Sequence, residues 1–264
     1  MNAHFITILS HRNALWLLVL LTLNLDGFFH FRVVDALVLG AFLVFLLVKK
    51  AWEFVHCALL FFLMSVAWRV FALMNLELSA LQLLMLFTLA TAMVWPFQVT
   101  HAAFSWVKIG RIDRISWVLL YLTGVISTGA LILWAFWTKD LGAGLRMVHG
   151  VSQYPAWLVF FVGIPLFALF NAFAEEIVYR GVLQEALMRM FALPTAILLQ
   201  ASAFAAIHVA SGFPNGAAGY VMVLAYGTML GYLRIRNAGM LAPYLAHVLA
   251  DLVIGAFLCV QVFL

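Results

Sequence analysis

Two adjacent carboxylates, followed four residues later by a guanidinium, are the most unusual feature of this sequence. Glu175 and Glu176 precede Arg180 in a chain that is 67% apolar and only 9% charged. An Asp, Lys or Arg at the centre of a membrane-spanning helix costs roughly 2.5–3.5 kcal/mol. Several ionisable side chains together therefore need a compensating role, and the group is typical of a working site.

Helical spacing gives the two glutamates different roles. Residues four apart share one face of a helix, so Glu176 lies over Arg180 and the two can form a structural ion pair. Glu175 points about 100° away, on the face that carries Tyr179, and has no obvious local partner. We therefore expect Glu175 to be the reactive carboxylate, and Glu176, Arg180 and Tyr179 to orient or support it.

Two histidines occur in similar spaced pairs further along the chain. The pairs are Phe204-x-x-x-His208 and His247-x-x-x-Asp251. Because His247 and Asp251 share a helix face, Asp251 can orient that imidazole or stabilise its charge. A carboxylate and two imidazoles in a poorly hydrated cavity can activate a water molecule, with Glu175 taking its proton and the other groups stabilising the oxyanion. The pattern predicts peptide hydrolysis within a membrane.

These three motifs, in this order and within apolar helices, resemble those of the CAAX protease and bacteriocin-processing (CPBP, or Abi) family. That family includes the type II CAAX prenyl endopeptidases, and the resemblance covers roughly residues 155–260. It implies that Glu175 and His208 activate the water, while His247 and the residue four positions later hold the oxyanion. It also implies that Phe204 belongs to the second motif as an orienting residue.

The last position of the third motif departs from the family pattern. Members that process prenylated substrates have Asn there, whereas this chain has Asp251. An ionised Asp would repel an oxyanion, so Asp251 must be protonated, paired with His247 or otherwise engaged. The departure bears on the prenyl-substrate assignment more than on the protease assignment.

A catalytic zinc site is the alternative interpretation of the same residues. Glu175, His208 and His247 would supply the two-His-one-Glu ligand set of such a site. The sequence has no His-Glu-x-x-His helix, and the three residues come from three separate apolar runs. We therefore favour a glutamate-type peptidase without a cofactor and keep zinc as the alternative.

The composition predicts the fold that must position these residues. Mean hydropathy is +1.13, which is typical of a polytopic helical membrane protein. Only Cys57 and Cys259 occur, so no disulfide framework is indicated. The all-α bundle is expected to contain nine spans, or eight if the polar residues among the first two interrupt a span. The predicted spans are 14–31, 34–48, 54–74, 78–100, 115–137, 154–173, 193–209, 216–235 and 239–262.

Within this single membrane domain, residues 1–150 carry no assignable motif and residues 151–264 form the expected catalytic core. With the N-terminus in the cytoplasm, ten of the fourteen Lys and Arg residues lie inside. We expect a bacterial inner (plasma) membrane protein whose first apolar run is retained rather than cleaved as a signal peptide. The spacing of Gly227 and Gly231 predicts close helix packing.

The depths of the two histidines conflict in this topology. At 1.5 Å per residue, His208 lies about 22 Å from the inner end of its span, but His247 lies about 12 Å from the inner end of its own. For both to reach Glu175, some helix must be broken, tilted or re-entrant.

Two other functions are compatible with intramembrane Glu, His and Asp. A proton-coupled transporter uses such residues as a proton relay, although no inverted halves are visible in the sequence. A non-catalytic membrane partner that keeps the fold is the second. The favoured partners are a membrane-associated peptide or protein substrate and the lipid bilayer, and the net charge of +4 lies mostly in loops, where it fits topology better than nucleic-acid binding.

Overall fold

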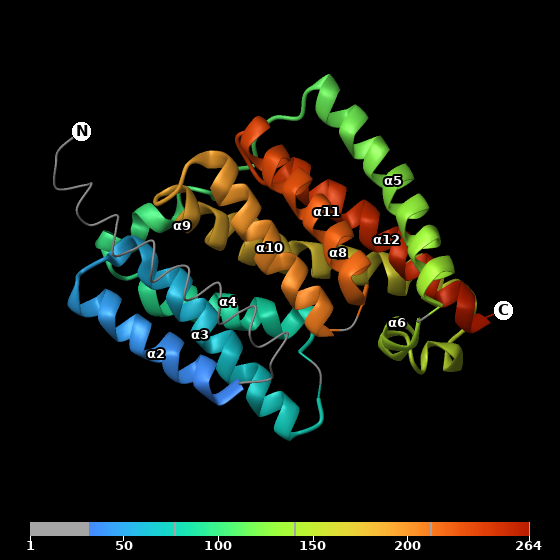
Figure 1. The fold of residues 1–264 in the computed structure, drawn as a ribbon, viewed down its shortest axis with the longest axis horizontal. Helices are drawn as coiled ribbons and strands as arrows, with labels where there is room; N and C mark the ends of the chain where they lie inside the picture. The colour runs from blue at the N-terminus through green and yellow to red at the C-terminus, as the bar shows by residue number, and fades with distance from the viewer. Residues whose placement is uncertain (1–31, 77, 140, 212, 264) are drawn as a thin grey trace.

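The computed structural model describes residues 32–263, apart from 77, 140 and 212, and every regular element in these ranges is helical (Figure 1). Two of the elements, η3 and η4, are π-helical, and two, η1 and η2, are 3-10 helices. In chain order the elements are α2 (Arg32–Val48), α3 (Trp52–Leu73), α4 (Ala80–Val94), η1 (Gln98–Phe104), α5 (Arg114–Thr138), α6 (Gly142–Met147), η2 (Val151–Gln153), α7 (Ala156–Leu158), η3 (Val159–Gly163), α8 (Ile164–Glu175), η4 (Glu176–Leu183), α9 (Gln184–Met188), α10 (Leu193–Ser211), α11 (Gly216–Arg236) and α12 (Leu241–Phe263).

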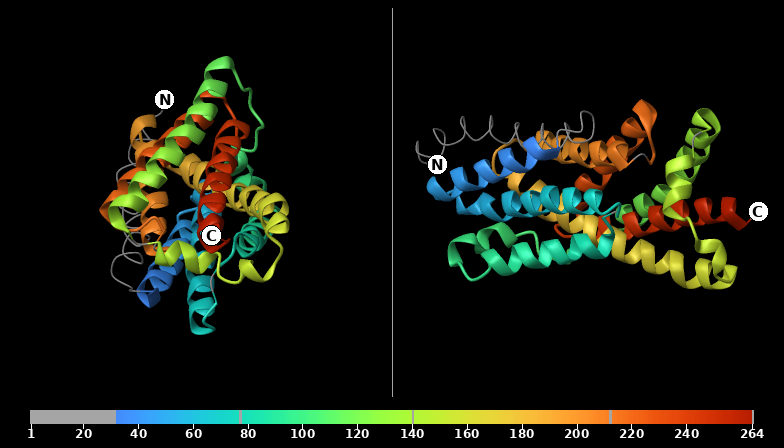
Figure 2. Two further views of the ribbon diagram at one scale, coloured as in Figure 1. Left: turned by 90° about the vertical axis from the view of Figure 1, so that its right-hand side faces the viewer. Right: turned by 90° about the horizontal axis from the view of Figure 1, so that it is seen from below.

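The helices form an elongated bundle, as the predicted fold class requires. Helices α2, α3 and α4 make up one end, and α5, α6 and the end of α12 make up the other (Figures 1 and 2). Helices α8, α10, α11 and α12 lie in the middle, where α10 packs on α11 and α12 packs on α8. All the predicted catalytic residues lie on these middle helices or directly at their ends.

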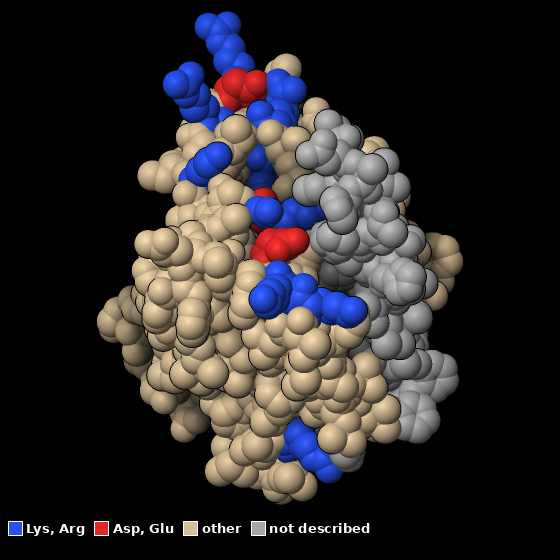
Figure 3. Space-filling model, turned by 90° about the vertical axis from the view of Figure 1, so that its left-hand side faces the viewer, with Lys and Arg blue, Asp and Glu red and all other residues tan. Residues whose placement is uncertain are grey.

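Among the residues that the structure describes, five helices are long and apolar enough to cross a membrane. They are Trp52–Leu73, Arg114–Thr138, Ala156–Met188, Gly216–Arg236 and Leu241–Phe263, and three shorter apolar helices cover 34–48, 80–94 and 193–209. Much of the surface is uncharged, and on the face drawn in Figure 3 the charged side chains gather in a few groups. The chain is therefore an integral membrane protein. The predicted span 14–31 lies outside the described residues, and the total of eight or nine spans stays a prediction.

The helix that carries Glu175 is longer than the sequence analysis expected. Ala156–Met188 runs for 33 residues through α7, η3, α8, η4 and α9, whereas the predicted span ended at 173. At 1.5 Å per residue it is about 50 Å long, more than the roughly 30 Å hydrocarbon core of a bilayer. An upright helix of this length would leave the core, so it must tilt or extend beyond it, and its two π-helical segments interrupt the regular α register.

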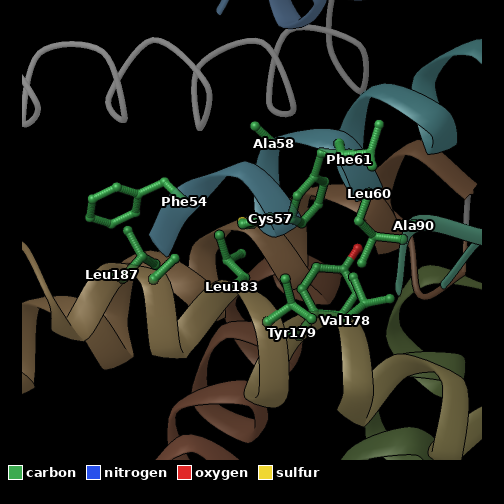
Figure 4. Packing of buried hydrophobic residues seen from close by; sticks show 14 of the residues in the cluster. Phe54, Cys57, Ala58, Leu60, Phe61, Ala90, Val178, Tyr179, Leu183 and Leu187 are labelled. Carbon is green, nitrogen blue, oxygen red and sulfur yellow. The ribbon is translucent and has the colours of Figure 1, made fainter. Parts of the chain in front are cut away.

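A hydrophobic cluster holds η4 against α3 and α4. Phe54 and Phe61 of α3 pack toward Leu183 and Leu187, and Tyr179 lies among the side chains between η4 and α4 (Figure 4). The whole of η4 is buried. The N-terminal helices without a motif therefore fix the segment that begins with Glu176.

Helices α10 and α11 approach closely at two glycines, as their spacing predicts. A Cβ atom on Gly227 would lie 3.2 Å from the Ala201 Cβ, and one on Gly231 would lie 2.7 Å from the Gln200 Nε2. The Gln200 Nε2 also donates a hydrogen bond to the Gly227 carbonyl at 2.9 Å. This packing fixes α10, and with it His208, relative to the rest of the middle helices.

Candidate active site

Residues from separate helices meet around the imidazole of His247. Glu175 is the last residue of α8 and Glu176 is the first of η4, while His247 and Asp251 lie one turn apart on α12. Helix α12 packs along α8, which brings the side chains of the first and third motifs together. The second motif is carried by α10, which also contacts η4.

Three carboxylates surround His247. Its Nδ1 donates a hydrogen bond to Glu176 Oε1 at 2.7 Å, and its Nε2 lies 3.4 Å from Glu175 Oε2 and 3.7 Å from Asp251 Oδ1. The imidazole is 3% exposed. Because Nε2 faces two carboxyl oxygens in a buried site, at least one proton must be shared among these three groups.

Glu176 is a partner of His247 that the sequence did not predict. Asp251 shares its helix face, but the short hydrogen bond comes from Glu176, which is 71 residues away in sequence. Asp251 Oδ1 lies at ion-pair distance from Nε2 instead. A ring nitrogen held by a carboxylate has a fixed orientation and proton position. Glu176 is therefore the residue that holds the His247 ring at Nδ1, and Asp251, expected either to orient that imidazole or to stabilise its charge, is placed to do the second.

Glu176 also pairs with Arg180, as the four-residue spacing predicts. Arg180 Nη1 lies 2.9 Å from Glu176 Oε1, and the two side chains are 0% and 2% exposed. The guanidinium carbon lies 4.1 Å from the centre of the Phe204 ring, which is within cation–π range. One carboxylate oxygen thus joins the buried guanidinium to the His247 imidazole.

Phe204 contacts both histidines of the site. Its ring centre lies 4.4 Å from that of His208 and 5.8 Å from that of His247, and Tyr179 packs against it edge-on at 5.0 Å. His208 Nδ1 lies 2.8 Å from the Phe204 carbonyl oxygen. A carbonyl can only accept, so this bond assigns the proton to Nδ1 and makes Nε2 the basic nitrogen of His208.

Asn171 is a site residue that the sequence analysis missed. Its Nδ2 donates a hydrogen bond to Asp251 Oδ2 at 3.1 Å, and its side chain also lies within hydrogen-bonding range of the Glu175 carboxylate. Asp251 is therefore engaged by both His247 and Asn171. A signal was present in the sequence, because Asn171 precedes Glu175 by four residues and is the only polar side chain between Pro165 and Glu175.

We expect the Asn171–Asp251 contact to show energetic coupling. Asn171→Asp brings two carboxylates together, and Asp251→Asn removes the charge that accepts the hydrogen bond. Each change is expected to cost about 1.5–3 kcal/mol of unfolding free energy. The Asn171→Asp/Asp251→Asn double variant again has one amide and one carboxylate, with the donor and acceptor exchanged. Its loss of unfolding free energy should therefore be at least 1 kcal/mol smaller than the sum of the losses in the two single variants. Chemical denaturation of the purified variants in detergent measures this.

A matched cycle provides the control for that coupling. Asp113→Asn makes the same chemical change at an exposed helix N-cap, and combining it with Asn171→Asp should give additive costs. If the losses of unfolding free energy in the Asn171 and Asp251 single variants simply add in the double variant, the contact between the two side chains is contradicted.

The zinc alternative can be compared with the positions of its three ligands. Among the residues that the structure describes, no group of three or more His, Cys, Asp and Glu is arranged to hold a metal ion. The proposed ligand His247 already uses Nδ1 to bind Glu176, which leaves Nε2 as the nitrogen that faces Glu175. As the structure places them, Glu175, His208 and His247 do not form the ligand set of a catalytic zinc site.

Comparison with known proteins identifies the segment that carries the motifs. Residues 155–253 match the family model described as "Type II CAAX prenyl endopeptidase Rce1-like". The matched segment contains all three motifs, from the Glu175–Glu176 pair to Asp251, and it confirms the resemblance to the CAAX protease and bacteriocin-processing family. Comparisons of the chain with curated proteins and with solved structures gave no match.

Proposed function

We propose that the chain is an intramembrane endopeptidase of the glutamate type, because residues 155–253 match the model of the Rce1-like type II CAAX prenyl endopeptidases. Its substrate is a peptide or protein associated with the membrane. Glu175 and His208 activate the hydrolytic water, and His247, held by Glu176 and charge-paired with Asp251, stabilises the oxyanion.

The observation that carries this proposal is the state of the Glu175 carboxylate. Its Oε2 is buried, has no hydrogen-bond partner among the described residues and lies 3.4 Å from His247 Nε2. Burying a carboxylate oxygen without a hydrogen bond is costly. The Oε2 of the neighbouring Glu176 is likewise buried without a hydrogen-bond partner among the described residues, but its Oε1 is held by both Arg180 and His247. Of the two adjacent acids, Glu175 is the one available to take a proton from water.

The reaction follows from these positions. Glu175 removes a proton from a water molecule oriented by His208 Nε2, and the water oxygen forms a bond to the peptide carbonyl carbon. The negative charge moves to the carbonyl oxygen, where a proton on His247 Nε2 stabilises it. The protonated Glu175 then gives its proton to the amide nitrogen as the carbon–nitrogen bond breaks. Glu176 and Asn171 act as positioning residues, because they hold His247 and Asp251.

Mass spectrometry of membrane peptides tests the proposal directly. The purified full chain is reconstituted into vesicles with a membrane-protein extract, and new peptide termini are compared with those from a His208→Ala preparation. Termini that appear only with the unaltered chain support the proposal, and identical peptide maps contradict it. Solute or proton flux through sealed vesicles that is lost in a Glu175 variant, without any new termini, would instead support the transporter alternative.

We also expect the activity to survive a strong chelator. Prolonged treatment of the purified chain with excess chelator should leave the cleavage rate within about twofold of the untreated rate, because the proposed steps use only side chains and water. Loss of activity that returns on adding zinc would assign Glu175, His208 and His247 to a metal site instead.

A further inference from the structure

A pocket lined by several charged residues lies away from the active site, where three of the long apolar helices begin or end. Helix α11 ends at Arg236, α12 begins at Leu241 and α5 begins at Arg114. The cavity has a volume of about 520 Å³, and its lining includes Lys108, Gly110, Arg111, Asp113, Arg236 and Asn237. In Figures 1 and 3 this region lies at the upper end of the molecule, and Figure 3 shows basic and acidic side chains gathered there.

Two backbone segments hold this pocket in a fixed shape. The Arg111 amide donates to the Asn237 carbonyl at 2.9 Å, and the Met240 amide donates to the Lys108 carbonyl at 2.8 Å. Gly110 has a φ of +83°, and a Cβ there would lie 2.5 Å from the Asn237 carbonyl oxygen. The loop before α5 and the loop after α11 are thus clamped together, so the side chains on the rim are held by a preorganised backbone.

The rim carries an excess of positive charge. Arg236 Nη2 pairs with Asp113 Oδ2 at 2.6 Å, whereas Lys108 and Arg111 are exposed and form no ion pair with any residue that the structure describes. Hydrogen bonds from the Ser116 backbone and hydroxyl lower the pKa of Asp113 to about 2, so this carboxylate is ionised at neutral pH. Three cations and one anion leave a net charge of +2 at the pocket.

The surroundings of the pocket are those expected at a membrane surface. Ile109 and Trp117 lie beside it and are 74% and 58% exposed, which is expected for side chains that contact lipid. Cationic side chains at the ends of spanning helices face the lipid headgroups. Guanidinium and ammonium groups bind phosphate oxygens through charge-assisted hydrogen bonds.

We propose that the pocket between the loop before α5 and the loop after α11 binds a phosphate group through Lys108 and Arg111. Its position at the ends of three apolar helices favours the headgroup of an anionic phospholipid as the source of that phosphate. Arg236 contributes less, because Asp113 already neutralises it. The Asp113 carboxylate lowers the affinity for phosphate, because it lines the same cavity and repels an anion.

Lipid titration of the purified full chain tests this proposal. Binding of phosphatidylglycerol and phosphatidylcholine is measured by native mass spectrometry in detergent, for the unaltered chain and for the Lys108→Gln/Arg111→Gln double variant. We expect the unaltered chain to prefer the anionic lipid and the double variant to bind it at least tenfold more weakly. The control is Lys49→Gln/Lys50→Gln, which removes the same charge from the loop between α2 and α3, and its affinity should stay within about twofold.

Two further measurements complete the test. Asp113→Asn keeps a residue that can cap α5 but removes the negative charge, so it should raise the affinity several-fold. Inorganic phosphate that competes at equal concentration, and loses its effect in the Lys108/Arg111 variant, would assign the pocket to free phosphate rather than to a lipid. The proposal would be overturned if the Lys108/Arg111 and Lys49/Lys50 double variants lost affinity for phosphatidylglycerol equally, or if neither lost any. None of these readouts depends on peptide cleavage.

Discussion

Glu175→Gln is expected to lower the cleavage rate by about 10²–10⁴-fold while leaving the fold intact. The substitution keeps the size and shape of the side chain but removes the group that takes the proton from water, and general-base catalysis typically contributes a factor of this order. The Glu175 Oε2 has no hydrogen-bond partner among the described residues, so little native bonding is lost. Initial cleavage rates with the substrate found by mass spectrometry measure the effect, and the thermal unfolding temperature in detergent should change by only a few degrees.

Two matched variants show whether the loss is specific. Glu53→Gln makes the same chemical change in the first turn of α3, and it should keep the full rate. His208→Ala should reduce the rate by a similar factor to Glu175→Gln, and His101→Ala, at an exposed position in η1, should not. The two active-site effects should be strongly non-additive, because both residues act on the same water molecule. If the Glu175→Gln variant cleaves at the same rate as the unaltered chain, the proposed glutamate mechanism is wrong.

Sequence spacing predicted the contacts that lie within one helix but not those between helices. The Glu176–Arg180 ion pair follows from residues four apart on one helical face. The hydrogen bond between Glu176 and His247 joins η4 to α12, and helical periodicity contains no information about which helices pack together. From the sequence, only Asp251, one turn away on the same helix, could therefore be named as a residue that orients His247 or stabilises its charge.

The apolar runs predicted most helix positions because a membrane demands long, uninterrupted hydrocarbon segments. The predicted runs 54–74, 115–137, 216–235 and 239–262 agree closely with α3, α5, α11 and α12. The run 154–173 was too short, because the helix continues through Glu175, Glu176 and Arg180 into α9. Polar residues normally end a predicted span, but here they are buried by pairing with one another. The length of this helix also bears on the mismatch in depth between His208 and His247, since a tilted helix can bring residues at different depths together.

The largest effect on stability is expected at Glu176. Glu176→Leu removes the carboxylate that pairs with Arg180 and leaves a guanidinium that is 0% exposed without an anion at 2.9 Å. Breaking a buried ion pair from one side typically costs about 3–5 kcal/mol. Arg180→Met in the same chain removes the stranded charge, and its unbranched side chain can still pack against the Phe204 ring. The Glu176→Leu/Arg180→Met double variant should therefore recover most of the lost unfolding free energy in chemical denaturation.

Activity should not recover with stability in that double variant. Leucine cannot accept the hydrogen bond that His247 Nδ1 donates to Glu176 Oε1 in the unaltered chain. The imidazole ring therefore loses its fixed orientation, and the proton on its Nε2 is no longer held in position. The matched Glu176→Gln/Arg180→Met variant keeps an acceptor oxygen without restoring the ion pair. It should be about as stable as the Leu/Met variant and cleave at least tenfold faster. Equal rates in the two double variants would mean that Glu176 serves only to neutralise Arg180, whereas a clear difference assigns it the positioning of His247.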